Sequence, residues 1–168
     1  IRMKCLCRLF NDVEKMITFN PNCSALKPIP RGSYTSFPHP KYSTLNKLVG
    51  RFNELSRSGS TNVPKVLLIE NGTHDEGGTY VIINIPISII GESREHCIVM
   101  GGLSMRGKKE DDVNVSNLTL RESKDNGIEG SNDQGGGVWQ DRASIHLDNV
   151  SVENSGRDGV SVYVSKRN

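Results

Sequence analysis

The sequence predicts an all-β solenoid, specifically a right-handed parallel β-helix with a short N-terminal capping helix and an extended N-terminal arm. Three observations lead to this fold class. Only 35% of the 168 residues are hydrophobic and 17 are glycine, which suits a core made of narrow files of inward side chains. Short apolar segments with a period of two follow Pro64. The stretch 113–128 recurs further along the chain at 145–160.

The predicted arm comprises residues 1–42. Its second half is interpreted as an extended linker because it contains four prolines: Pro28, Pro30, Pro38 and Pro40. Residues 1–64 carry ten Lys or Arg against three Asp or Glu. This positive segment is interpreted either as a solvated leader or as a contact for an acidic partner. It contains no dense basic run interleaved with aromatic residues, so we do not expect nucleic acid as a partner.

Cysteine usage and hydropathy limit the function further. Four cysteines are too few and too unevenly spaced for a disulfide framework or a zinc site: Cys5, Cys7, Cys23 and Cys97. We therefore predict no structural metal and no cofactor. No stretch approaches the roughly 20 apolar residues that a membrane-spanning helix needs, so no membrane span is predicted.

A short amphipathic helix is predicted at residues 44–55. Its apolar residues recur at steps of three and four behind a Ser43-Thr44 cap, and the pattern stops near Ser58-Gly59. These residues are Leu45, Leu48, Phe52 and Leu55. Because a linear stack of repeats needs a cap at each end, we expect the four side chains to cover the N-terminal end of the solenoid.

Short strands are predicted after Pro64. Each is only a few residues long and is followed by Gly, Asn or charged residues, which leaves no room for helices of useful length. The predicted strands are 66–69, 81–83, 87–89, 98–100, 103–105, 113–115 and 118–120.

The internal repeat aligns residues 113–128 with residues 145–160 without a gap. Every apolar position finds an apolar partner, and three other positions also match: Asn117 with Asn149, Ser123 with Ser155, and Gly127 with Gly159. We predict that the two segments stack as neighbouring parallel turns of chain. The two asparagines should form left-handed corners and bond to each other, and the glycine-rich insertion 131–137 should leave the stack as a loop.

Several segments in the region from residue 43 onward carry a family resemblance. The capping helix is followed by Val66-Leu-Leu-Ile-Glu-Asn-Gly-Thr-His, then by Gly78-Thr-Tyr, and then by Ile85-Pro-Ile-Ser-Ile-Ile-Gly91. This order resembles the pectin-lyase-like superfamily of right-handed parallel β-helix repeat proteins. The resemblance implies a β-helix domain over residues 43–168, and it covers polysaccharide lyases, glycosidases, epimerases and non-enzymatic proteins alike.

The resemblance also directs attention to charged residues. Lyases of this superfamily hold calcium with acidic clusters and use Arg or Lys as base, so the catalytic candidates are Asp111, Asp112, Asp141 and Arg142. The competing interpretation, which we favour, is that these residues belong to solvated loops and turns. Two further residues are candidate ligand contacts, Trp139 and His146, with packing of the inserted loop and plain surface exposure as their competing interpretations.

The predicted function is that of a non-enzymatic binding or assembly module that presents a rigid wall to a protein partner or a glycan. The motifs Gly-His-Gly, Asn-Thr-Asp and Asp-Pro-His-Asp, typical of glycosidases and epimerases with this fold, are absent from the sequence. The alternative is a polysaccharide lyase or uronate epimerase, which alone would need calcium.

Because residues 159–164 begin a new turn of chain, we expect further coils or another chain to cover that end.

Overall fold

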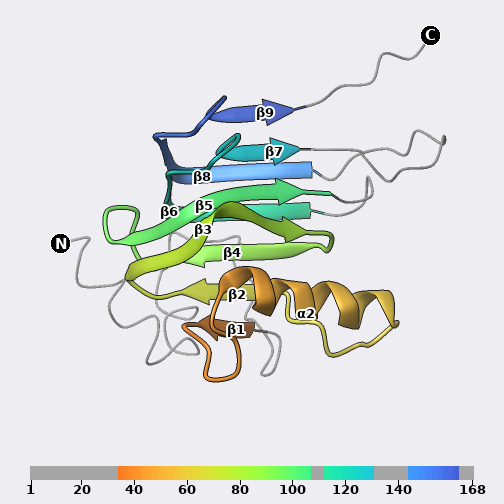
Figure 1. Ribbon diagram of the computed structural model, residues 1–168. Coiled ribbons are helices and arrows are strands. Elements are labelled where there is room, and N and C mark those ends of the chain that lie inside the picture. Colours follow the sequence, from red (N-terminus) through yellow and green to blue (C-terminus); the bar gives the residue numbers. More distant parts are fainter. Residues whose placement is uncertain (1–33, 107–111, 131–143, 163–168) are drawn as a thin grey trace, which may run out of the picture.

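The computed structural model describes residues 34–106, 112–130 and 144–162. Within them the chain is mostly β, and its strands are stacked along one direction from β1 to β9 (Figure 1). All pairs between named strands are parallel. The strands are β1 (Tyr34–Phe37), β2 (Val66–Ile69), β3 (Gly72–Ile83), β4 (Ile87–Gly91), β5 (Cys97–Met105), β6 (Asp112–Arg121), β7 (Ile128–Gly130), β8 (Ser144–Glu153) and β9 (Val160–Val162), and one helix, α2 (Leu45–Arg57), precedes β2.

The parallel pairs fall into three series, which we call stack one, stack two and stack three. Stack one contains β1, β2, β4, residues 112–116 of β6 and residues 144–148 of β8. Stack two contains residues 72–75 of β3, 97–100 of β5, 118–121 of β6 and 150–153 of β8. Stack three contains residues 80–83 of β3, 102–105 of β5, β7 and β9.

The predicted repeat is confirmed as a pairing register. Val113 pairs with Ile145 and Leu120 with Val152, and beyond the next corner Ile128 pairs with Val160. Inward residues of the three stacks form one apolar core that includes Leu67, Val99, Leu118 and Ile128. Parallel strands buried in this way need alternating apolar side chains, which is the period-two pattern of the sequence.

Several strands are longer than the short segments that the sequence predicts. β3 has 12 residues, β5 has 9, and β6 and β8 have 10 each, because a strand continues around a corner with parallel partners on both sides. In β6 and β8 the corners are Asn117 and Asn149, whose φ angles are 56° and 52°. The predicted left-handed asparagines are therefore confirmed, and Asn149 Nδ2 donates to Asn117 Oδ1 at 2.9 Å.

Asn149→Ala is expected to lower the free energy of unfolding by about 2 kcal/mol. The change removes a side-chain hydrogen bond and also places a Cβ-bearing residue without a local hydrogen bond in the left-handed region. Asn149→Gly loses only the hydrogen bond, so it should cost about 1 kcal/mol. Urea unfolding of both variants measures the difference. Equal losses for alanine and glycine would show that the backbone angle carries no cost.

Helix α2 agrees with the predicted helix in its N-cap residue and in most of its apolar face. The Thr44 hydroxyl accepts a hydrogen bond from Lys47 N, and Leu45, Leu48 and Phe52 are buried in the core. Leu55 is only partly buried, whereas Val49 is fully buried and was not predicted. The helix lies beside β3, the strand with which it shares most of its interface (Figure 1).

Two asparagines of α2 satisfy backbone groups of β3 and the residue after it. Asn53 Nδ2 donates to Ile82 O at 2.8 Å, and Asn84 N donates to Asn53 Oδ1 at 3.1 Å. Asn46 Oδ1 accepts from Ile82 N at 3.4 Å. An unpaired strand edge exposes such donors and acceptors, so the helix covers both the apolar core and the polar edge of stack three.

Strand β1 lies within the segment 1–42 that the sequence assigns to the arm. Tyr34 pairs with Val66 and Phe37 with Ile69, so residues 34–37 form the first strand of stack one. This strand was not predicted, because Tyr-Thr-Ser-Phe between prolines lacks the apolar alternation of the other strands. Residues 1–33 of the predicted arm, and the predicted loop 131–137, lie outside the described residues.

Apolar side chains are exposed at the β8–β9 side of the sheet. Leu147, Val160 and Val162 keep 41%, 51% and 55% of their surface, whereas Val115 and Ile128, the stack partners of the first two, are buried. A cover for this side, by further coils or another chain, stays a prediction. No described helix is long and apolar enough to cross a membrane.

Candidate functional site

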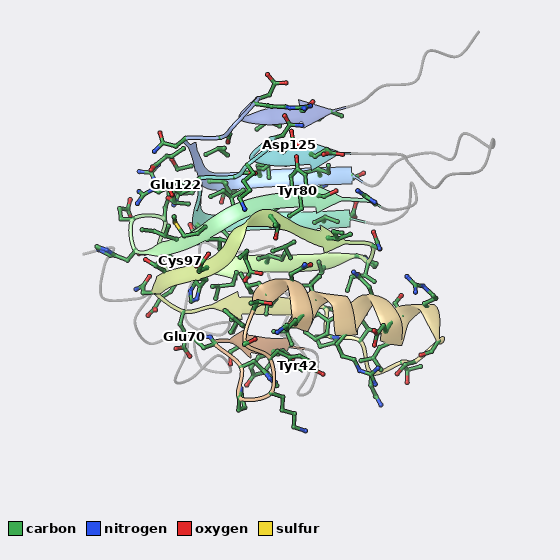
Figure 2. The ribbon with its side chains drawn as sticks, viewed as in Figure 1. Tyr42, Glu70, Tyr80, Cys97, Glu122 and Asp125 are labelled. Atoms are coloured by element: carbon green, nitrogen blue, oxygen red, sulfur yellow. The ribbon has the colours of Figure 1, made fainter. Side chains whose placement is uncertain are left out.

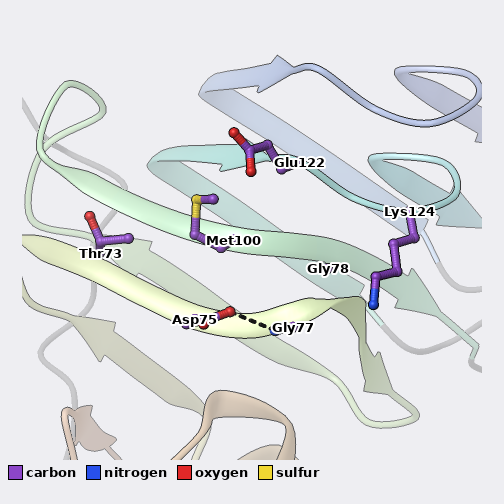
Figure 3. A pocket seen from close by; sticks show the side chains of 7 residues that line it. All are labelled: Thr73, Asp75, Gly77, Gly78, Met100, Glu122 and Lys124. Atoms are coloured by element: carbon purple, nitrogen blue, oxygen red, sulfur yellow. Dashed lines mark hydrogen bonds between the residues drawn. The ribbon is translucent and has the colours of Figure 1, made fainter.

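A groove of about 380 Å³ lies on the outer side of stack two (Figure 3). It is produced by a change of register between β3 and β5. Asp75 pairs with Met100 and Tyr80 with Gly102, so four residues of β3 lie opposite a single residue of β5. We call residues 76–79 the bulge. The groove is lined by Thr73, Asp75, Gly77, Gly78, Met100, Glu122 and Lys124.

The side chains of the groove come from neighbouring strands and from the turn after β6. Thr73 and Asp75 are exposed on the outer face of β3, and Met100 is the partner of Asp75 on β5. Met100 in turn pairs with Arg121, the last residue of β6, and Glu122 follows directly. In Figure 3, Glu122 and Asp75 lie on opposite sides of Met100, with Thr73 at one end and Lys124 at the other.

Gly78 closes one end of the groove by a close approach of two backbones. Its φ angle is 72°, and Lys124 N donates to Gly78 O at 2.9 Å. A Cβ at this position would lie 3.0 Å from Glu122 O and 3.0 Å from Lys124 Cγ. The position therefore needs glycine both for its left-handed backbone and for space, and it fixes the Lys124 stem beside the groove.

The other side of the bulge holds the helix. Glu76 is 7% exposed, and its two carboxylate oxygens accept from Leu45 N at 2.6 Å and from Asn46 N at 3.1 Å. These N–H groups have no partners within the helix, because they belong to its first turn. Burial raises the pKa of Glu76 above 4.5, and the two backbone hydrogen bonds oppose this shift. One four-residue segment thus shapes the groove outside and anchors α2 inside.

Glu122 has an unusual backbone conformation for its residue type. Its φ angle is 55°, and the other described non-glycine residues with positive φ are Asn117, Asn149 and Asn154. Asparagine tolerates this region, whereas a longer side chain without a local hydrogen bond loses about 1 kcal/mol there. Asn154 occupies the equivalent corner, because Arg121 pairs with Glu153 and each corner residue follows directly. A strained glutamate therefore lines the groove where the next turn of chain has asparagine.

Charges beside the groove are neutralised. Arg121 Nη2 and Nε donate to Glu153 Oε2 at 2.7 and 2.9 Å. The hydrogen bond from Arg121 and a second one from Ser151 lower the pKa of Glu153, so this pair stays ionised. Within the groove, Asp75 Oδ1 accepts from Gly77 N at 2.7 Å, which orients the carboxylate without cancelling its charge.

Two side chains with acid–base or nucleophilic potential serve the fold instead (Figure 2). Burial raises the pKa of the Cys97 thiol to about 12, so the reactive thiolate is not populated at neutral pH. Burial, together with a hydrogen bond to Glu129, also raises the pKa of Tyr80 to about 12. The Tyr80 hydroxyl accepts from Asn126 N at 3.0 Å, so it organises the turn after β6.

The residues predicted as candidates lie elsewhere. Asp112 and His146 are both on stack one, with side chains 66% and 60% exposed, and His146 Nε2 is 3.8 Å from Asp112 Oδ1. The structure brings these two together, but neither lines the groove. Asp111, Trp139, Asp141 and Arg142 lie outside the described residues. Among the residues that the structure places, no three His, Cys, Asp or Glu side chains form a group able to hold a metal ion.

None of the groove residues was predicted from the sequence. They are contributed by separate strands and share no local motif, so the pair Gly77-Gly78 between two apolar segments was the only signal of an irregular strand. Chemically, the groove offers a hydroxyl, two carboxylates and an ammonium group around a thioether. Comparison with family models, with curated proteins and with solved structures finds no match for this chain.

Proposed function

We propose that this chain is part of a right-handed parallel β-helix of the pectin-lyase-like kind and that it acts as a non-enzymatic binding module. The fold proposal is supported by the spacing of paired residues along the chain, which is the same in two stacks. Val113 pairs with Ile145 in stack one, and Ile128 pairs with Val160 in stack three. Three parallel stacks that share one apolar core are the arrangement expected of such a helix.

The ligand that we propose for the groove is a saccharide. Sugar hydroxyls both donate and accept hydrogen bonds, and the groove offers carboxylates as acceptors, an ammonium as donor and the Thr73 hydroxyl as either. Met100 is partly exposed at the centre and offers an apolar, polarisable surface to a sugar ring. The parallel strands beneath hold these groups in fixed positions, which reduces the entropy lost on binding.

One observation carries this proposal, the left-handed backbone of Glu122 at the groove. A conformation that costs stability at one of two equivalent corners is typical of residues kept for recognition. Asparagine would relieve the strain there, as it does at position 154. Glutamate at this corner is explained if its carboxylate binds the ligand.

Glu122→Asn is therefore expected to raise the free energy of unfolding by about 1 kcal/mol and to weaken saccharide binding at least about tenfold. Urea unfolding measures the first effect. Titration calorimetry with saccharides found on an immobilised glycan panel measures the second. Asp148→Asn, which removes an exposed carboxylate from stack one, is the matched control and should leave binding unchanged.

Two results would contradict the proposal. One is unchanged affinity in Glu122→Asn for every saccharide that the wild type binds, and the other is no binding to any saccharide of the panel. Release of an unsaturated product from a uronate polymer, or proton exchange at the sugar C5, would instead favour the lyase or epimerase alternative.

A further inference from the structure

We infer that the groove selects saccharides that carry a free amino group and disfavours uronates. This inference rests on the proposed function and adds the chemical class of the ligand. It starts from the charges that line the groove. Asp75 and Glu122 contribute two carboxylates, and Lys124 contributes one ammonium group, so the lining has a formal charge of −1.

The surroundings do not reverse this sign. The basic side chain nearest in register is Arg121, the partner of Met100, and its hydrogen bonds at 2.7 and 2.9 Å both go to Glu153. Within the described part of the chain, the ion pairs involve neither Asp75 nor Glu122. Lys124 is therefore the one base among the lining residues, and the two carboxylates keep the lining at a net negative charge when a ligand arrives.

The arrangement of the groups favours a cation near Met100. Asp75 and Glu122 lie on opposite sides of Met100, so an ammonium group above the thioether would approach both carboxylates (Figure 3). Asp75 Oδ1 is held by Gly77 N, which fixes the direction of this carboxylate before the ligand arrives. Hydrogen bonds between an ammonium and a carboxylate are roughly twice as strong as neutral ones.

Lys124 determines how the groove binds the uncharged and the acidic groups of a saccharide. Its stem is held over Gly78, at the end of the groove opposite Thr73. There the ammonium group donates to neutral hydroxyls of the same saccharide. A uronate in the groove would gain one contact with Lys124 but would bring its carboxylate toward two like charges, an arrangement that raises the free energy of the complex.

The test compares three ligands of equal length by titration calorimetry at pH 6: a glucosamine oligomer, its N-acetylated form and a galacturonate oligomer. We expect the glucosamine oligomer to bind at least about tenfold more tightly than the acetylated form, and the galacturonate oligomer to bind most weakly. Added salt should weaken binding of the glucosamine oligomer and leave binding of the acetylated oligomer nearly unchanged.

Three variants assign the selectivity to named residues. Glu122→Gln and Asp75→Asn should each reduce the preference for the amino form about tenfold, with less effect on the acetylated form. Lys124→Met should weaken the acetylated form and should not lower the preference, because it removes the one positive charge of the lining and leaves both carboxylates. A lysine oligopeptide of equal charge is the control for unspecific attraction and should bind more weakly than the glucosamine oligomer.

The outcomes separate this inference from the proposed function. Equal or tighter binding of the acetylated or the uronate oligomer overturns the inference and leaves the saccharide site in place. Equal binding of the lysine oligopeptide overturns it as well, because charge alone would then explain the affinity. Binding of none of the saccharides overturns the proposed function together with the inference.

Discussion

Gly91→Ala is expected to lower the free energy of unfolding by about 3 kcal/mol or more, which is a large part of the stability of a domain this size. Gly91 is buried at the end of β4, and its partner in the register is Ile69 of β2. A Cβ at Gly91 would fall onto the backbone carbonyl of Asn117 and lie 2.9 Å from Cys97 Sγ. The carbonyl belongs to the left-handed corner of β6, so it moves only if that corner is distorted.

The matched control is Gly50→Ala in helix α2. A Cβ at Gly50 has no neighbour within 4 Å, so the substitution is expected to raise the free energy of unfolding by about 0.5–1 kcal/mol through helix propensity. Urea unfolding followed by circular dichroism measures both variants. If Gly91→Ala unfolds at the same urea concentration as the wild type, the result contradicts the close packing of β4 against the Asn117 corner of β6.

Glu76→Ala is expected to lower the free energy of unfolding by about 2–4 kcal/mol. The change leaves Leu45 N and Asn46 N without their acceptor in a buried place, and each unpaired group costs about 1–3 kcal/mol. Amide hydrogen exchange should quicken first at Leu45 and Asn46. Faster exchange spread evenly over the strands instead would argue against an anchor at the helix.

Glu76→Gln isolates the pH dependence of this contact. Because the pKa of Glu76 is raised in the folded protein, folding favours its protonated form. The pH-dependent part of its contribution to stability is complete below the unfolded value of 4.5 and is lost as the pH rises through the folded value. Wild type should therefore gain stability relative to Glu76→Gln as the pH falls from neutral to 4.5. A constant difference between the two proteins across this range would contradict the raised pKa.

The parts of the fold that repeat could be predicted from the sequence. The gapless alignment of the two copies determines the register of β6 with β8 and of β7 with β9, because an apolar side chain one position out of register would face solvent. The corner asparagines followed from the same alignment, since few residue types tolerate a left-handed backbone. Helix α2 was predictable because its cap and its apolar spacing are local.

The features that do not repeat could not be predicted. β1 has no copy elsewhere in the chain, and its place in stack one depends on pairing with β2, on the far side of the helix in the sequence. The hydrogen bond between Leu45 N and Glu76 joins two positions far apart in the chain, so no local sequence pattern predicts it. The groove likewise depends on the register shift between β3 and β5, which becomes visible only when the strands are paired. His146 and Asp112 were both named from the sequence, but their proximity is a result of the pairing of β6 with β8.

The bulge at residues 76–79 restricts how this protein can change during evolution. Loops at the surface usually gain or lose residues freely, because few contacts depend on their length. Here one added or deleted residue would separate Glu76 from the helix N-terminus or Gly78 from Lys124, since both contacts start from the same four positions. The length of this segment is therefore restricted by two contacts at once, one with helix α2 and one with the turn after β6. Related chains should vary in sequence around it before they vary in its length.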